Sequence, residues 1–240
     1  MLKEAFAYLV SLKENKTYTI NGDTYSDHEL HRIAPYIERP FRIKVNGLDS
    51  IAQLIRHEID MEAEHLPLFI RVDSPRRVEV FSALDDMMGR DELYEAICDA
   101  PEFRPGWMDQ EQAIIALRSM FIPNDEGTGY LLDLISRIIK DDGVTSDDNG
   151  VSQSVTARSG VSLKNFEQVK QRIPLAPFRT FVEVQQPMSE FILRLDDNCR
   201  VGLIEADGGA WRMEAKHNIR SYFEEELAEE IAAHKVVVML

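Results

Sequence analysis

The last third of the chain, residues 175–240, constrains the fold most. Apolar and polar residues alternate through its first part, which predicts three short strands. The alternation breaks at Asp207-Gly208-Gly209, gives way to an acidic amphipathic helix over 213–227 and ends in an apolar strand over 234–240. This order predicts a compact β-β-β-α-β module. Because an exposed apolar edge invites aggregation, the final strand should be central in a sheet or paired across a subunit interface.

Residues 1–140 predict an N-terminal α/β and helical region. Apolar residues recur at helical spacing in 1–14, 47–64, 109–121 and 130–140, and 91–99 also favours a helix. Asp49 or Ser50 could cap the second of these helices, and Asp109 could cap the helix over 109–121. Strand patterns occur on both sides of an Asn21-Gly22 turn and at 41–45, 68–72 and 78–81. The chain is therefore expected to be an α+β protein with a mixed β-sheet and packed helices.

Residues 141–174 predict a polar loop or arm and a connector to the C-terminal module, 175–240. The part from 141 to 160 is rich in Asp, Ser, Thr, Asn and Gly, with only scattered apolar residues. Such a segment buries too little surface to offset the entropy that ordering costs. The three regions can still belong to one domain.

Composition limits the classes of protein to which the chain can belong. No apolar run approaches the roughly 20 residues that span a bilayer, so no membrane association is expected. Cys98 and Cys199 are isolated, which argues against a disulfide framework and for a reducing compartment. The net charge of −15 disfavours non-specific wrapping of nucleic acid. It leaves open a self-repelling soluble surface, a basic partner or DNA mimicry, and a local basic groove.

Three strings of residues carry a family resemblance: VSQSVTARSG at 151–160, LAPFRTFVEVQQP from Leu175 and EADGGAW from Glu205. With them the chain resembles the phage and prophage proteins of unknown function related to YfdQ, above all a branch common in phages of Gram-positive hosts. The resemblance covers most of the chain and is strongest over 151–231. It implies a phage-encoded protein of the host cytoplasm, and it implies a role in phage DNA metabolism because such genes accompany recombination and replication functions. It brings no catalytic residues with it.

One pattern resembles a catalytic site. An acidic residue at a strand end, followed by Glu-x-Lys, is typical of Mg²⁺-dependent nucleases, and Mg²⁺ prefers carboxylate oxygens. The residues concerned are Glu205, Asp207, Glu214 and Lys216. The competing interpretation is a turn at Asp207 followed by solvated helix residues. His28 and His31 could bind a metal or be exposed beside a helix cap, and without a common nucleotide-binding motif no cofactor is expected.

Two further sets of residues are candidates for binding. Hydroxyl and basic side chains that could contact phosphate oxygens lie in and after the polar stretch, namely Ser152, Ser154, Thr156, Arg158 and Lys164. Four nearby Asp residues oppose that role, and a disordered connector or an arm to a neighbouring subunit stays open. An acidic docking surface or a plain solvated face is formed by Glu224, Glu225, Glu226, Glu229 and Glu230.

Three hypotheses for the function follow. The first is a non-enzymatic phage accessory protein that acts by self-assembly or binding in phage DNA metabolism. Its expected partners are copies of itself and single- or double-stranded DNA or a host or phage protein. The second is an acidic inhibitor of a host defence or DNA-processing protein. The third is a Mg²⁺-dependent nuclease centred on Asp207 and Glu214.

Overall fold

The computed structural model divides the chain into two units, Met1–Arg39 and Pro40–Leu240. It describes residues 3, 5, 6, 8, 17–20, 23–26, 39–60, 66–85, 88–140, 144–148, 153–159, 162–163, 167–168, 170–195 and 200–240. In the first unit, β1 (Thr17–Ile20) and β2 (Asp23–Ser26) pair antiparallel, with Tyr18 opposite Tyr25. This confirms the hairpin predicted around residues 21 and 22.

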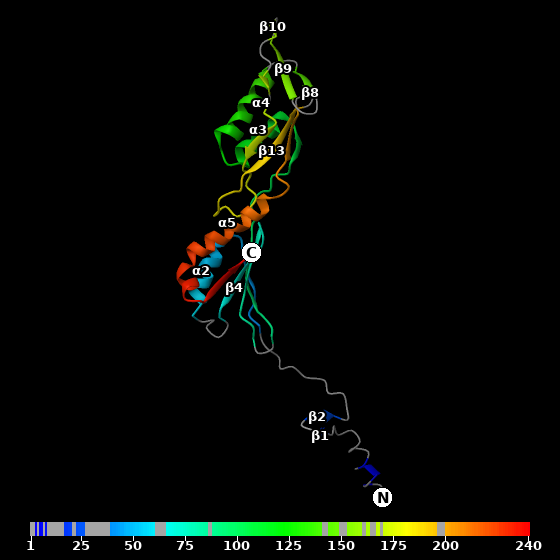
Figure 1. Ribbon diagram of the computed structural model, residues 1–240, viewed down its shortest axis with the longest axis vertical. Helices are drawn as coiled ribbons and strands as arrows, with labels where there is room; N and C mark the ends of the chain where they lie inside the picture. Colours follow the sequence, from blue (N-terminus) through cyan, green and yellow to red (C-terminus); the bar gives the residue numbers. More distant parts are fainter. Residues whose placement is uncertain are drawn as a thin grey trace. The chain divides into compact units, whose positions relative to one another are not determined.

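A mixed five-stranded sheet, which confirms the predicted fold class, lies in the second unit (Figure 1). Its order is β15-β4-β5-β6-β3, and only the β15–β4 and β3–β6 pairs are parallel. The strands are β3 (Ile43–Val45), β4 (Leu68–Ser74), β5 (Arg77–Phe81), β6 (Glu92–Ile97) and β15 (Val236–Met239). The helix expected over 91–99 is wrong, because pairing with β5 and β3 on either side holds this segment extended.

One face of this sheet packs against helices α2 (Leu48–Glu58) and α5 (Trp211–Glu226). Alternate residues of β4 point inward, so that Ile70 is buried with Ile55 of α2 and Phe223 of α5 in one core. Burying each such side chain stabilises the fold by about 1.5–3 kcal/mol. The short helix α6 (Ala228–Ala232) follows α5 and leads into β15.

A second, antiparallel sheet has the order β12-β13-β14-β7. It consists of β7 (Gly106–Met108), β12 (Arg172–Leu175), β13 (Ser189–Leu195) and β14 (Val201–Glu205). Its core includes residues of α3 (Gln110–Ser119) and α4 (Tyr130–Lys140). The π-helical turn η2 (Asp125–Gly129) directly precedes α4 along the chain. Three phenylalanine rings meet edge to face in this core, with Phe103 and Phe121 centroids 4.6 Å apart. Asp109 caps α3 as predicted, in a capping box with Gln112.

Strands also form in the region expected to be a polar loop. Here β8 (Val144–Asp148), β10 (Ser162–Leu163) and β11 (Glu167–Gln168) all pair antiparallel with β9 (Gln153–Ser159). These four segments are therefore strands within the stretch expected to be a polar loop or arm, and its role as an arm or connector stays a prediction. Val and Thr are frequent in β8 and β9, and backbone pairing satisfies their polar groups without a large apolar core.

Two strands, a helix and a last strand occur within 175–240, but the first of the three strands expected there is wrong, because β12 ends at Leu175 and the next strand begins only at Ser189. The last strand also joins a different sheet. β12, β13 and β14 belong to the antiparallel sheet, whereas β15 pairs with β4. Helix α5 packs on both β4 and β15, and α6 also contacts β15. These contacts position β15 beside β4 in the five-stranded sheet. There β15 is an edge strand, so the expectation of a central position is wrong.

Across the residues described above, no helix is both long and apolar enough to cross a membrane.

The contact between η2 and β12 gives a test of this packing. A Cβ at Gly127 would lie 2.1 Å from the carbonyl oxygen of Pro174, so Gly127→Ala forces backbone to move. We expect its unfolding free energy in urea to fall by about 1–3 kcal/mol. Gly106→Ala is the matched control, because nothing lies within 4 Å of its Cβ position. Equal stability of the two variants would contradict the packing described.

Candidate functional site

A buried arginine joins the two strings LAPFRTF and EADGGAW. Arg179 follows β12, and its Nη1 donates to the Glu205 carboxylate at the end of β14. Its Nη2 donates to the Pro187 carbonyl at 3.1 Å and to Ser189 Oγ. The guanidinium also stacks on the Trp211 ring at 4.1 Å. Only 3% of Arg179 is exposed, so these contacts replace its water.

Asp207 extends the same cluster in the turn that precedes α5. Ser189 Oγ accepts from Arg179 and donates to Asp207 Oδ2 at 2.5 Å. The backbone amides of Gly209 and Trp211 donate to the same carboxylate at 2.9 and 3.3 Å. Gly208 and Gly209 have φ of 65° and 83°, which glycine adopts without strain. The glycines thus let the chain turn tightly around Asp207 before the helix begins.

Opposing effects set the charge states in this cluster. Burial lowers the pKa of Arg179, and the nearby Glu205 and Asp207 carboxylates only partly offset it. For Asp207, burial raises the pKa, but the bonds from Ser189, Gly209 and Trp211 and the charge of Arg179 outweigh it and leave the pKa below its usual value. The cluster is therefore an ion-paired one with Asp207 ionised at neutral pH.

The predicted nuclease residues do not converge on a metal site. Glu205 and Asp207 face Arg179 and Ser189, whereas Glu214 is exposed in the first turn of α5 and Lys216 lies two residues further along it. Glu-x-Lys is thus helical and not on the strand that a nuclease core requires. In the part of the chain that the structure describes, no three His, Cys, Asp or Glu side chains are placed to hold a metal ion.

The predicted phosphate contacts fall in the β8–β11 sheet. Ser154, Thr156 and Arg158 lie in β9. Ser152 and Lys164 lie outside the described residues, as do His28 and His31. A role for this set in binding stays a prediction.

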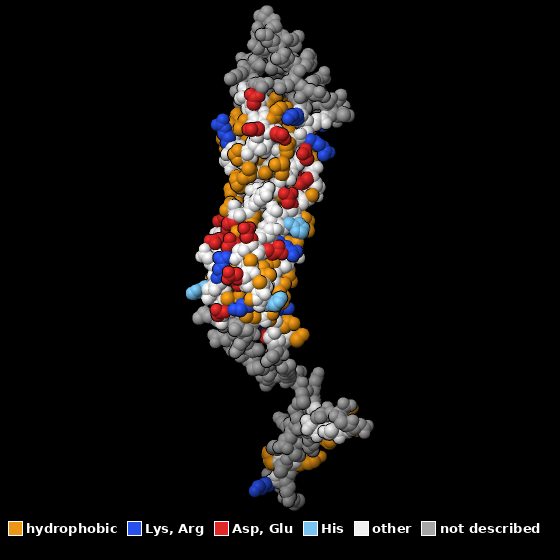
Figure 2. All heavy atoms as spheres, turned by 60° about the vertical axis from the view of Figure 1, so that its left-hand side comes forward, with side chains coloured by type: hydrophobic (Ala, Val, Ile, Leu, Met, Phe, Trp, Pro, Cys, Tyr) orange, Lys and Arg blue, Asp and Glu red, His pale blue; other side chains and the backbone are white. Residues whose placement is uncertain are grey.

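The acidic residues near the C-terminus divide into paired and unpaired groups. Glu224 pairs with Arg220 at 2.6 Å, and Glu226 pairs with Arg56 at 2.8 Å. Glu225 at the end of α5 and Glu229 on α6 are exposed, and Glu230 beside them is partly exposed. On the face seen in Figure 2, acidic side chains are interspersed with basic and apolar ones and form no continuous acidic surface.

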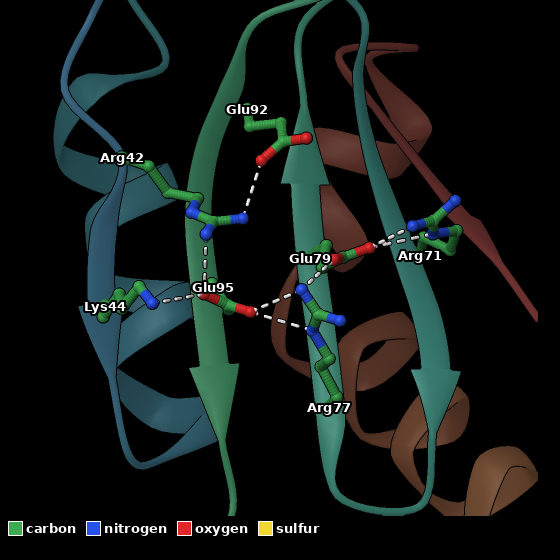
Figure 3. A network of polar contacts seen from close by, with 7 residues as sticks. All are labelled: Arg42, Lys44, Arg71, Arg77, Glu79, Glu92 and Glu95. Atoms are coloured by element: carbon green, nitrogen blue, oxygen red, sulfur yellow. Dashed lines mark hydrogen bonds and ion pairs between the residues drawn. The ribbon is translucent and has the colours of Figure 1, made fainter.

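The open face of the five-stranded sheet carries a network that the sequence did not reveal (Figure 3). Glu79 and Glu95 lie on neighbouring strands, and both are buried although helices cover only the opposite face. Arg77 bridges them at 2.8 and 2.7 Å, and Arg71 pairs with Glu79. Arg42 and Lys44 reach Glu95 at 3.3 and 3.4 Å. Basic side chains thus cover two carboxylates.

Electrostatics explain why the buried Glu95 carboxylate stays ionised. Burial raises the pKa of Glu95, but the bond from Arg77 and the charges of Arg42 and Arg77 outweigh it and lower the pKa overall. The pKa of Arg77 is raised, chiefly by Glu79. Charged residues in RVEVF and ELYEAI are the local signal, but strand pairing decides which of them meet.

Beside this network lies a shallow pocket of about 240 Å³, lined by Phe69, Arg71, Phe81, Arg90 and Met239. The Arg71 guanidinium lies 5.0 Å from the Phe81 ring centroid, and that of Arg90 lies 4.4 Å from the Phe69 centroid. Each ring is therefore paired with a cation at favourable distance. The pocket combines apolar walls with two guanidinium groups.

Comparison with models of protein families, with curated proteins and with solved structures finds no match to this chain. Within the fold, the strings LAPFRTF and EADGGAW meet through Arg179, Glu205 and Trp211. Residues of these two segments therefore build an internal joint of the fold.

Replacing the central arginine tests this joint. Arg179→Met leaves Glu205 and Ser189 without their donor, and we expect the unfolding free energy to fall by about 2–4 kcal/mol. Arg179→Lys keeps the charge but loses the planar fork, so its loss should be smaller. Arg172→Met, at an exposed position of β12, is the control and should change stability little. Equal urea midpoints for all three variants would refute the joint.

Acid unfolding tests the ionised state of Asp207. Because its pKa is lowered in the fold, its stabilising contribution is present above about pH 4 and is lost as the pH falls through the folded-state pKa. The unfolding free energy of Asp207→Asn should therefore drop less than that of the wild type between about pH 6 and pH 3. Glu95 remains and acts in the same direction, so some dependence persists. A variant with the full wild-type slope would contradict this assignment.

Proposed function

We propose that the chain is a phage-encoded, non-enzymatic accessory protein that acts by self-assembly and binding in phage DNA metabolism. The observation that carries the proposal is the five-stranded sheet, which has helices on one face and an apolar edge strand, β15. The resemblance of the three strings to YfdQ-related phage proteins supports the part of the proposal that places the protein in a phage and in phage DNA metabolism.

The buried polar cluster favours a structural role over a catalytic one. Its carboxylates accept bonds from Arg179, Ser189 and backbone amides, which leaves them engaged within the fold. A nuclease would need these oxygens for a metal ion. The open face of the sheet is the better candidate for a working surface.

This face gathers cations in an acidic protein. Arg42, Lys44, Arg71, Arg77 and Arg90 are its basic residues, against Asp73, Glu79, Glu92 and Glu95. The five cations outnumber the four carboxylates in a chain of net charge −15. Phosphate is thus repelled less here than elsewhere, and paired guanidinium and phenyl groups suit the stacking of unpaired bases. Single-stranded DNA is the partner that we assign to this face.

Binding of a labelled single-stranded oligonucleotide, measured by fluorescence anisotropy, tests the assignment. Arg71→Gln/Arg90→Gln should weaken binding roughly tenfold because two phosphate or stacking contacts are lost. Arg118→Gln/Arg172→Gln makes the same charge change at exposed positions of α3 and β12 and should leave binding unchanged.

Equal weakening by both double variants would show that total charge, and not this face, governs binding. Absence of binding by the wild type would overturn the DNA assignment. That result would favour the alternative function, an acidic inhibitor of a host defence or DNA-processing protein. The observation that supports this alternative is the exposure of Glu225 and Glu229.

A further inference from the structure

The backbone of β15 has one side paired and one side free for pairing. In a parallel ladder, alternate residues bond to the same neighbour. The Leu68 amide donates to the Lys235 carbonyl at 2.8 Å, and Val236 stands opposite Leu68 in the register. Residues 235, 237 and 239 therefore bond to β4, and the amide and carbonyl groups of Val236 and Val238 point outward. Outside the strand ladder, no backbone hydrogen bond among the described residues ends on either valine.

A groove follows this outer edge. It has a volume of about 400 Å³ and is lined by Pro67, Arg220, Glu224, Ile231, His234 and the three valines 236–238. On the open face of the sheet, Val237 and Met239 are 39% and 37% exposed. An extended segment placed here would meet apolar side chains on both faces and unpaired backbone groups along the edge.

The charges of the groove do not oppose a second copy of this acidic chain. Arg220 and Glu224 pair with each other at 2.6 Å, and Lys235 pairs with Asp60 at 2.8 Å. The local surface is thus close to neutral although the chain carries −15. From Val236 to Met239 the strand has no charged residue or proline of the kind that guards exposed edges.

We propose that two copies of the chain pair antiparallel through the outer edges of β15, about a two-fold axis that passes by Val237. This deepens the self-assembly part of the proposed function. In this register Val236 of one copy stands opposite Val238 of the other, and the two-fold axis repeats this pair. The two residues of each pair exchange two backbone hydrogen bonds, so the interface has about four. Every outward group of the two valines is then satisfied, and five strands from each copy form one continuous sheet.

The register places the two Val237 side chains directly opposite each other on the open face. Such a non-hydrogen-bonded pair has Cα atoms about 4.5 Å apart. The apolar strip of Val237, Met239, Phe69 and Phe81 then continues across the axis. The dimer should also tighten with salt, because screening weakens the repulsion between two chains of net charge −15.

Solution mass of like-charge variants tests the interface. The wild type, at 27.5 kDa per chain, should sediment as a dimer, and Val237→Lys should weaken the dimer roughly a hundredfold because two lysines face each other. Val182→Lys makes the same change at a side chain that is 70% exposed and far from β15 in sequence, and it should stay dimeric. A monomeric wild type, or an undiminished Val237→Lys dimer, would overturn the proposal.

A cysteine at the axis gives a second readout that does not depend on weakening. Val237→Cys should form a disulfide-linked dimer on mild oxidation, since the expected Cα separation suits a disulfide. Met213→Cys, exposed on α5, is the control and should not cross-link. The wild type is oxidised in parallel as a second control, because its own Cys98 and Cys199 could also form cross-links. Failure of Val237→Cys to cross-link above the control would refute this register.

The edge proposal and the DNA assignment fail separately. A monomer that binds single-stranded DNA through Arg71 and Arg90 would retain the binding role and refute the edge pairing. A β15-linked dimer that ignores DNA would do the reverse. A dimer that Val237→Lys leaves intact would place self-assembly on another surface.

Discussion

Burial of the Arg179 guanidinium is the constraint on which the rest of this structure depends. A charge that is 3% exposed is tolerated only where ion pairs and hydrogen bonds replace its water. Glu205, Ser189, the Pro187 carbonyl and the Trp211 ring supply these contacts from the end of β14, the start of β13, the connector before it and the start of α5. Four separate segments therefore have to reach their places together. Glu205 and Asp207, two of the four residues that resemble a catalytic set in the sequence, hold this joint.

The connector after β12, residues 176–188, then fixes one sheet to the other. Thr180 Oγ1 donates to the Pro75 carbonyl at 2.5 Å, in the turn between β4 and β5, and the Leu48 amide at the start of α2 donates to Glu183 at 2.8 Å. Phe181 enters the core of the five-stranded sheet, while the buried Gln186 amide holds the connector itself. Because α2 and α5 are thereby committed to one face, they leave the other face and the edge of β15 uncovered, and we propose that these are the surfaces for binding.

Local sequence patterns predicted much of the fold and little of its working surface. The Asp109 cap, the alternation in β4 and the apolar spacing of α5 are local, and each appeared as expected. The cap of α2 was expected at Asp49 or Ser50, but Glu183 supplies it from 135 residues away. Likewise the segment at 91–99 has helix-forming residues, and its pairing with β5 and β3 makes it a strand. The burial of Glu79 and Glu95 depends on cations from neighbouring strands, which no periodicity reveals. The apolar character of β15 predicts that it is central in a sheet or paired across a subunit interface, but the strand lies at an edge, and the pairing stays a prediction.

We propose that this edge and face of the sheet carry the function, and amide hydrogen exchange of β15 as a function of protein concentration tests this most directly. The Val237 and Met239 amides bond to β4 and should be protected at every concentration. The Val236 and Val238 amides point outward and should exchange quickly in dilute protein but become protected as dimers form. Rapid exchange of Val236 and Val238 at all concentrations would contradict the account, since the edge would then remain unpaired.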